Sequence, residues 1–175
     1  MIVHFKGAFR DGPLPLYPES AGLRFGLGAF ETLLYNGRAL CRLEAHLERL
    51  GRSLAALDLT FEPQDHHEIL PEVVRRNGLE GGYARVNLFC FEEAEGIPAR
   101  FLSTAAPYDP APLSPLRLRP CPDLHESRLC GHKTMNHAPF ILARRRARAL
   151  GFDDALLLDR DGLGLETAAA ALVVA

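Results

Sequence analysis

Residues 30–41, Phe-Glu-Thr-Leu-Leu-Tyr-Asn-Gly-Arg-Ala-Leu-Cys, decide the fold of the first half of the chain. Aromatic, aliphatic and β-branched side chains dominate residues 30–35, and the dipeptide Asn36-Gly37 follows them. Asn-Gly tolerates the positive φ angles of a type I′ turn better than most dipeptides. The stretch therefore predicts a β-hairpin with strands at residues 30–35 and 38–41.

An amphipathic helix is predicted directly after this hairpin. Leucines recur there at spacings of four, three, four and three residues, which places them on one side of a helix. We expect this side to pack on the hairpin. The leucines of the stripe are Leu43, Leu47, Leu50, Leu54 and Leu57.

Further signals extend this first domain on both sides. Residues 2–5 alternate like an edge strand, and a second amphipathic helix is predicted at residues 63–77. Two more strands are predicted at residues 84–91 and 100–104. Together these segments predict an α+β domain over residues 1–108.

A proline-rich stretch marks the end of that domain. Four prolines fall within residues 107–115, too many for a helix or an inner strand. We predict a connector at residues 109–115 and a second domain over residues 116–175. In that domain a strand, a helix, a strand and a turn leading into another strand are predicted at residues 116–119, 137–150, 155–158 and 159–162.

The composition limits the classes of partner. Of the 175 residues, 47% are hydrophobic and 24% are charged, which is typical of a globular protein. The formal net charge of -2 favours neither nucleic acid nor an anionic membrane, and no apolar run approaches the roughly 20 residues that span a bilayer. The four cysteines form no CxxC pair, and the start lacks the apolar core of a signal peptide. We expect reduced thiols and a cytoplasmic location.

Two cationic side chains are candidates for chemistry. Lys133 lies between a polar loop and the start of a predicted helix, where a side chain can be held near a buried site. Arg49 and His46, three residues apart, share one flank of the leucine-rich helix. Taken alone, Lys133 and Arg49 are most simply interpreted as solvated, because such residues are seldom buried.

Five segments in order change that interpretation. They are Gly26-Leu27-Gly28-Ala29-Phe30-Glu31-Thr32, His46-Leu47-Glu48-Arg49-Leu50 with Ser53, Lys133-Thr134-Met135-Asn136, residues 153–159, and Leu165-Glu166-Thr167. In order and spacing they resemble the class IV aminotransferases, which are fold-type IV enzymes that depend on pyridoxal 5′-phosphate (PLP). This family includes branched-chain aminotransferases, D-amino-acid aminotransferases and 4-amino-4-deoxychorismate lyases.

The resemblance implies a fold and a cofactor site. The fold would be an N-terminal two-layer α/β sandwich followed by the start of a barrel-like C-terminal domain, with PLP between them in a homodimer. Lys133 would form the Schiff base with PLP, because a lysine amine is nucleophilic when its pKa is lowered. Glu166 would pair with the pyridine nitrogen, and Arg49 would bind the phosphate. Phe30 would line the substrate pocket, although a core phenylalanine explains it equally well.

Three functions remain open. The first is transfer of an amino group between an amino acid, branched-chain or another, and a 2-keto acid, both of them small-molecule substrates. The second is the lyase reaction, which releases pyruvate and 4-aminobenzoate from aminodeoxychorismate. The third is a non-catalytic remnant or interaction protein, because Ala171 stands where the family usually has asparagine and the chain stops at residues 173–175, where the family continues. We expect either a fragment or a partner that covers the second domain.

Two other patterns carry less weight. The four arginines within residues 144–148 fit a solvated helix face better than a nucleic-acid surface, because apolar residues mark the opposite side of the helix. A group of possible zinc ligands has a spacing that matches no common structural zinc pattern, and we expect no metal there. These residues are His125, Cys130, His132 and His137.

Overall fold

The computed structural model describes residues 1–110, 114–124 and 127–173. The chain divides into two compact units, the first made of residues 1–111 and 132–135 and the second of residues 112–131 and 136–175. Each unit has its own sheet and its own apolar core. The predicted connector includes residues 111–113, which lie outside the described residues.

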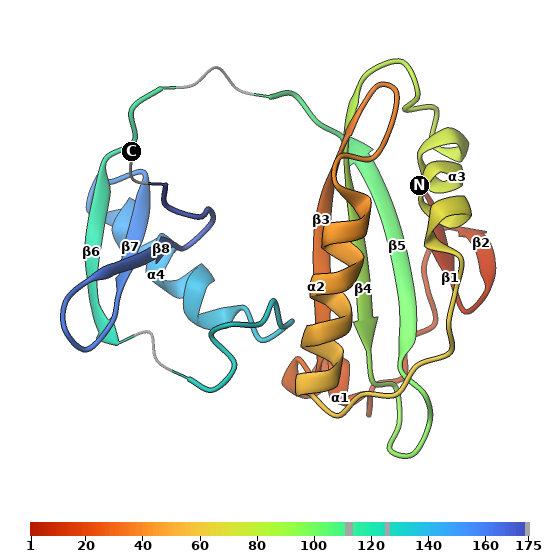
Figure 1. The fold of residues 1–175 in the computed structure, drawn as a ribbon, viewed down its shortest axis with the longest axis horizontal. Helices are drawn as coiled ribbons and strands as arrows, with labels where there is room; N and C mark the ends of the chain where they lie inside the picture. Colours follow the sequence, from red (N-terminus) through yellow and green to blue (C-terminus); the bar gives the residue numbers. More distant parts are fainter. Residues whose placement is uncertain (111–113, 125–126, 174–175) are drawn as a thin grey trace. The chain divides into compact units, whose positions relative to one another are not determined.

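A five-stranded antiparallel sheet forms the centre of the first unit (Figure 1). Its strand order is β2-β1-β5-β4-β3, so β3 is an outer strand. β3 and β4 pair along their full length, with Gly28 opposite Phe91 and Asn36 opposite Tyr83. The strands are β1 (Ile2–Phe5), β2 (Ala8–Asp11), β3 (Gly28–Asn36), β4 (Tyr83–Phe91) and β5 (Arg100–Pro107).

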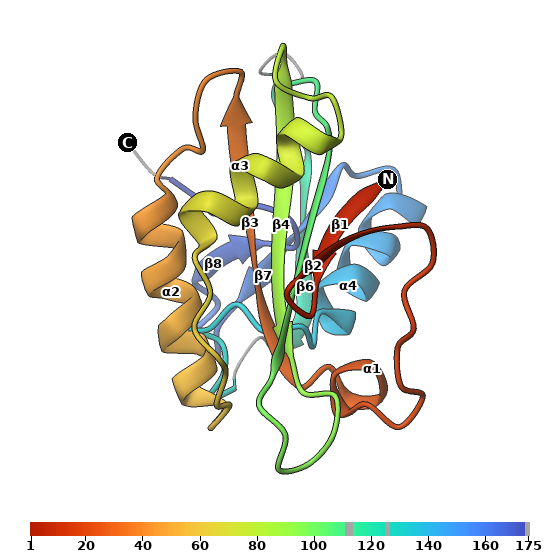
Figure 2. The same ribbon diagram turned by 90° about the vertical axis from the view of Figure 1, so that its right-hand side faces the viewer.

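Two helices cover one face of this sheet, α2 (Leu43–Ala56) and α3 (His66–Arg76), whereas the short α1 (Ala21–Phe25) precedes β3. Figure 2 shows α3 in front of the strands and α2 beside β3. The leucine stripe explains the placement of α2, because Leu50 and Leu54 turn into the core. The predicted two-layer sandwich is confirmed. Its core includes Leu33, Leu70, Val73, Val86, Leu88 and Phe101.

The turn after β3 differs in detail from the predicted hairpin. The side-chain oxygen of Asn36 accepts two backbone N–H groups of the turn, and Gly37 has a φ of 86°. The chain then pairs with β3 through one bridge, between Tyr35 and Leu40. The second strand is this short because α2 begins almost at once, at Leu43. The long partner of β3 is β4.

The opposite face of the sheet carries the side chains that alternate with those of the core. Phe30 and Thr32 of β3 are half-buried there, between the fully buried residues of the helix-covered face. The Phe30 and Phe89 rings stack with their centroids 5.8 Å apart, and the Thr32 hydroxyl donates to the side-chain oxygen of Asn87 at 2.9 Å. This face is therefore both aromatic and polar next to β3.

The second unit is a three-stranded sheet with one helix. β6 (Leu118–Leu124) and β7 (Asp154–Leu158) run parallel, and α4 (Ala138–Ala149) forms the crossover between them. β8 (Gly164–Thr167) follows β7 through a turn and pairs with it antiparallel. A small core includes Ala143, Ala147, Ala155 and Leu157.

The helices of the described residues are short. Among them, none has both the length and the apolar character needed to cross a bilayer. The four cysteines are free thiols, and Cys90 and Cys121 are buried. Burial raises the pKa of the Cys90 thiol to about 12.

Candidate functional site

Residues 133–135 run along the outer edge of β3. The carbonyl of Lys133 accepts the N–H of Phe30 at 3.0 Å, and the N–H of Met135 donates to the carbonyl of Gly28 at 2.8 Å. An antiparallel bridge joins Thr134 to Ala29 between these two bonds. The residues on either side of this segment in sequence belong to the second unit, but these backbone bonds make the segment itself part of the first unit.

Gly28 permits this close approach. A Cβ atom at residue 28 would lie 2.6 Å from the carbonyl oxygen of Cys90 on β4 and 2.8 Å from the sulfur of Met135. Real Cβ atoms do not approach other atoms so closely, so a larger residue displaces the backbone of β4, whereas the flexible Met135 side chain can give way. The glycine that opens β3 is therefore required by the close pairing with β4, at the residue that also bonds to Met135.

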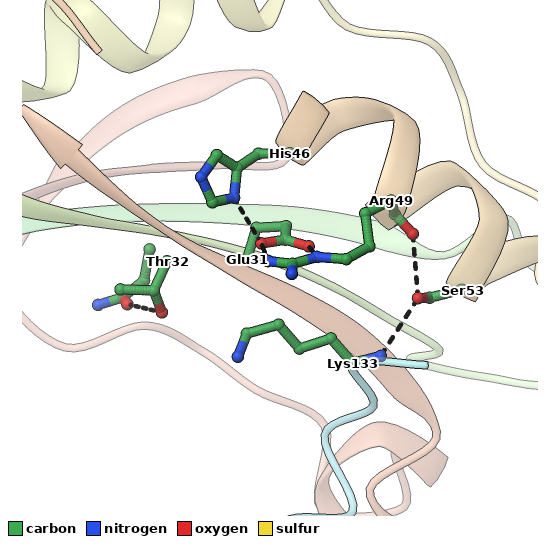
Figure 3. Close-up of polar contacts among 7 residues, drawn as sticks. Glu31, Thr32, His46, Arg49, Ser53 and Lys133 are labelled. Atoms are coloured by element: carbon green, nitrogen blue, oxygen red, sulfur yellow. Dashed lines mark hydrogen bonds and ion pairs between the residues drawn. The ribbon is translucent and has the colours of Figure 1, made fainter. Parts of the chain in front are cut away.

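Lys133 is held from α2 as well as from β3. Its backbone N–H donates to the hydroxyl of Ser53 at 3.3 Å, and that hydroxyl donates to the carbonyl of Arg49 at 3.0 Å. The Lys133 amine lies 4.6 Å from the centroid of the Phe30 ring, at the distance of a cation–π contact. Figure 3 shows the Lys133 side chain extending along β3 beside the polar groups of α2.

A buried carboxylate organises those polar groups. Glu31, which is 0% exposed, accepts hydrogen bonds from both Nε and Nη2 of Arg49, each at 2.6 Å. His46 Nδ1 lies 2.7 Å from the oxygen of Glu31 that also accepts Arg49 Nη2. All three side chains are drawn in Figure 3. The Arg49 side chain itself is 45% exposed, so its far edge reaches solvent.

The electrostatics of this cluster favour its charged form. Burial by itself raises the pKa of Glu31, but the hydrogen bonds and charges of Arg49 and His46 outweigh it, and the net pKa lies below the ordinary value. The hydrogen bond to Glu31 raises the pKa of Arg49. Glu31 and Arg49 therefore form a fixed ion pair at neutral pH.

The sequence-predicted site residues divide between the two units. The first unit contains Lys133, Phe30 and Arg49 close to the start of β3. Glu166 belongs to β8 of the second unit, where it pairs with Leu157 of β7 and forms a bridge with Ala171. Phe30 contacts both Lys133 and another aromatic ring, which is compatible with either role predicted for it.

Two residues of the site had no role in the sequence interpretation, although both lie in the motif segments. Glu31 carried a usable signal, because it shares its strand face with Leu33 and Tyr35 and is thus a charge at a core position. A buried carboxylate needs a basic partner, and the helix that follows the strand in sequence could have been expected to supply one. Ser53 carried a weaker signal, because a serine within a helix is usually exposed.

The possible zinc ligands form no metal site in the described residues. Within residues 1–110, 114–124 and 127–173, no three histidine, cysteine, aspartate or glutamate side chains are grouped to hold a metal ion. His125 lies outside this part of the chain.

Comparison with known proteins gives consistent matches. The family described as amino-transferase class IV matches residues 28–175. A probable branched-chain-amino-acid aminotransferase of Rickettsia conorii is 30% identical over 141 residues, which are 73% of this chain and 48% of that protein. The aminodeoxychorismate lyase of Bacillus subtilis is 37% identical over 76 residues, or 42% of this chain and 26% of the lyase.

The fold also matches solved structures. The branched-chain aminotransferase from the thermophilic archaeon Thermoproteus uzoniensis, in its structure with norvaline, superposes with a TM-score of 0.84 at 22% identity, covering 96% of this chain and 63% of that one. The match confirms the fold that was expected from sequence. The chain spans about half the length of the curated aminotransferases that it matches.

Proposed function

The chain belongs to the class IV aminotransferase family, whose members depend on PLP, and on that premise we propose that it forms part of an enzyme that moves an amino group between an amino acid and a 2-keto acid. The observation that carries the proposal is the fixed position of Lys133. Backbone bonds to β3 and to Ser53 hold it beside Arg49, which places an amine and a guanidinium together in one unit.

The residues of the first unit suit PLP. An amine is the group that can attach to its aldehyde, and a guanidinium edge suits its phosphate. When bound, PLP supplies an electron sink that stabilises negative charge on the α-carbon of the substrate. Lys133 then has two tasks, which are to carry the cofactor and to hold or release a proton at Nζ.

The scarcity of lysine supports this role. The chain has 18 arginines but only two lysines, Lys6 and Lys133. Arginine supplies a surface charge as well as lysine does, but it does not supply a nucleophilic amine. Lys6 has a structural partner, because its amine lies 2.8 Å from the buried carboxylate of Glu93. Lys133 is the lysine that backbone bonds hold in the site, so we assign the covalent role to it.

The remaining roles belong to the same proposal. Glu166 would pair with the pyridine nitrogen of PLP, and its position on a short paired strand supports a fixed orientation. Phe30, whose ring lies under the Lys133 amine, would border the substrate pocket. The substrates are small molecules, an amino acid and a 2-keto acid, and the whole enzyme acts as a cytoplasmic homodimer.

The direct test follows amino transfer. Purified protein with PLP is incubated with paired amino acids and 2-keto acids, and the new amino acid is quantified for the wild type, Lys133→Arg and Lys6→Arg. The proposal expects transfer in the wild type and Lys6→Arg and none in Lys133→Arg. Equal transfer by Lys133→Arg, or none by folded, PLP-loaded wild type, would reject it.

The lyase reaction is the second candidate, and the match to the Bacillus subtilis aminodeoxychorismate lyase favours it. It differs in needing no amino acceptor. Aminodeoxychorismate incubated with the PLP-loaded protein alone would then yield pyruvate and 4-aminobenzoate. Formation of both products without amino transfer in the paired assay would replace the aminotransferase proposal by the lyase.

A further inference from the structure

Glu31 lies where an apolar side chain is expected. Its neighbours on the same strand face, Ala29 and Leu33, are buried and apolar, and Glu31 is equally buried. A charged carboxylate at such a position is unfavourable unless it is paired and fully hydrogen-bonded. The carboxylate is therefore retained for what it binds rather than for packing.

The pair with Glu31 uses one edge of the Arg49 guanidinium. Nε and Nη2 each donate to a different oxygen of the carboxylate, which is the bidentate arrangement that fixes the guanidinium plane. A guanidinium has five N–H donors, so this pair leaves about three of them, on Nη1 and Nη2, for another acceptor. These donors belong to a side chain that is 45% exposed.

The carboxylate is itself locked in place. His46 bonds to the Glu31 oxygen that also accepts Nη2, so three hydrogen bonds define the orientation of one carboxylate. His46 and Arg49 both come from α2, which fixes the carboxylate against one helix. An arginine on a helix surface would otherwise sample many rotamers.

We propose that Glu31 is a positioning residue, which holds the inner edge of Arg49 so that the outer edge is presented to the phosphate of PLP. This inference rests on the proposed function. The proposed arrangement is unusual, because the Glu31 carboxylate is an anion that lies close to a binding site for another anion, the phosphate. By charge alone, removing Glu31 strengthens phosphate binding, whereas loss of positioning weakens it.

The charge effect and the positioning effect change the phosphate affinity in opposite directions, so an affinity measurement distinguishes them. The affinities of PLP and of pyridoxal, which lacks the phosphate, are measured by visible absorption on the full chain. The ratio of the pyridoxal dissociation constant to the PLP dissociation constant isolates the phosphate contact. For Glu31→Gln this ratio falls about tenfold, since one interaction with a charged group is weakened. A ratio equal to or above that of the wild type overturns the inference.

Two controls separate positioning from general damage. Glu72→Gln removes a carboxylate that makes the same bidentate pair with Arg75 on the exposed surface of α3, and it leaves the ratio unchanged. In an Arg49→Gln background, Glu31→Gln has no further effect on the ratio. An equal loss of PLP and pyridoxal affinity in Glu31→Gln means a structural role only, and it also overturns the inference.

A second variant covers the case in which Glu31→Gln does not fold. His46→Ala keeps the pair between Glu31 and Arg49 and removes one of the three bonds to the carboxylate. We expect the ratio of the pyridoxal to the PLP dissociation constant to fall in His46→Ala as well, by a smaller factor than in Glu31→Gln. A ratio equal to that of the wild type refutes the inference. Failure of the wild type to bind PLP rejects the proposed function itself. If Arg49→Gln changes the ratio of dissociation constants but Glu31→Gln and His46→Ala do not, only the role of Glu31 is rejected.

Discussion

Replacement of Gly28 by alanine probes the contact that holds Lys133. The added Cβ would lie 2.6 Å from the Cys90 carbonyl oxygen, 2.8 Å from Cβ of Phe91 and 2.8 Å from the Met135 sulfur. The first of these is backbone of β4 and cannot move without disturbing the strand pairing, whereas the flexible Met135 side chain can. We therefore expect Gly28 to be pushed away from β4, which disturbs the backbone bond between Met135 and Gly28 that holds the Lys133 segment, with a loss of about 1–3 kcal/mol in the free energy of unfolding.

Gly51→Ala is the matched control. Gly51 lies within α2, and a Cβ there meets no atom within 4 Å among the described residues. Alanine is favoured over glycine inside a helix by about 0.5–1 kcal/mol, so this variant becomes more stable. Urea denaturation gives both free energies of unfolding, and PLP absorption reports on the site. A Gly28→Ala protein as stable as the wild type, with unchanged PLP affinity, would refute the described packing at residue 28.

Two further predictions concern Ser53, which bonds to Lys133, and His66, which begins α3. Ser53→Ala leaves the Lys133 N–H without its acceptor, at a cost of about 1–3 kcal/mol in the free energy of unfolding. We expect this variant to bind PLP more weakly, while circular dichroism shows that α2 is intact. Unchanged PLP binding would mean that Ser53 is not part of the site. Burial lowers the pKa of His66 from 6.5 to about 4, so its neutral form contributes stability above pH 6.5 that is lost as the pH falls toward 4. His66→Phe should flatten the urea midpoint between pH 6.5 and 4, and an unchanged pH dependence would contradict this.

Local patterns predicted the elements of the fold. The leucine stripe from Leu43 predicted α2, and the residue types of residues 30–35 before the Asn36-Gly37 turn predicted β3, because both signals are local in sequence. The pairing of β3 with β4 joins residues about fifty positions apart, and no local signal encodes that choice. The hairpin expected after Asn36-Gly37 was reduced to one bridge, between Tyr35 and Leu40, because α2 begins almost at once, at Leu43.

The site was predictable in its residue types but not in its connections. The motifs indicated Lys133 and Arg49, and the structure adds that Ser53 and Glu31 tie both to α2 and β3. The bond between Lys133 and β3 spans about a hundred residues of sequence and depends on how the chain returns to the first sheet. Two local facts could have strengthened the prediction, namely the glutamate on a core face and the presence of only two lysines.

Covalent labelling of Lys133 tests the central claim most directly. The folded protein is mixed with PLP, reduced with borohydride and digested, and the modified peptide is identified by mass spectrometry. With Lys6 as the other lysine of the chain, the experiment has a built-in comparison. The account predicts a phosphopyridoxyl group on Lys133 and none on Lys6. A label on Lys6 alone, or no label on Lys133 in folded protein, would contradict it.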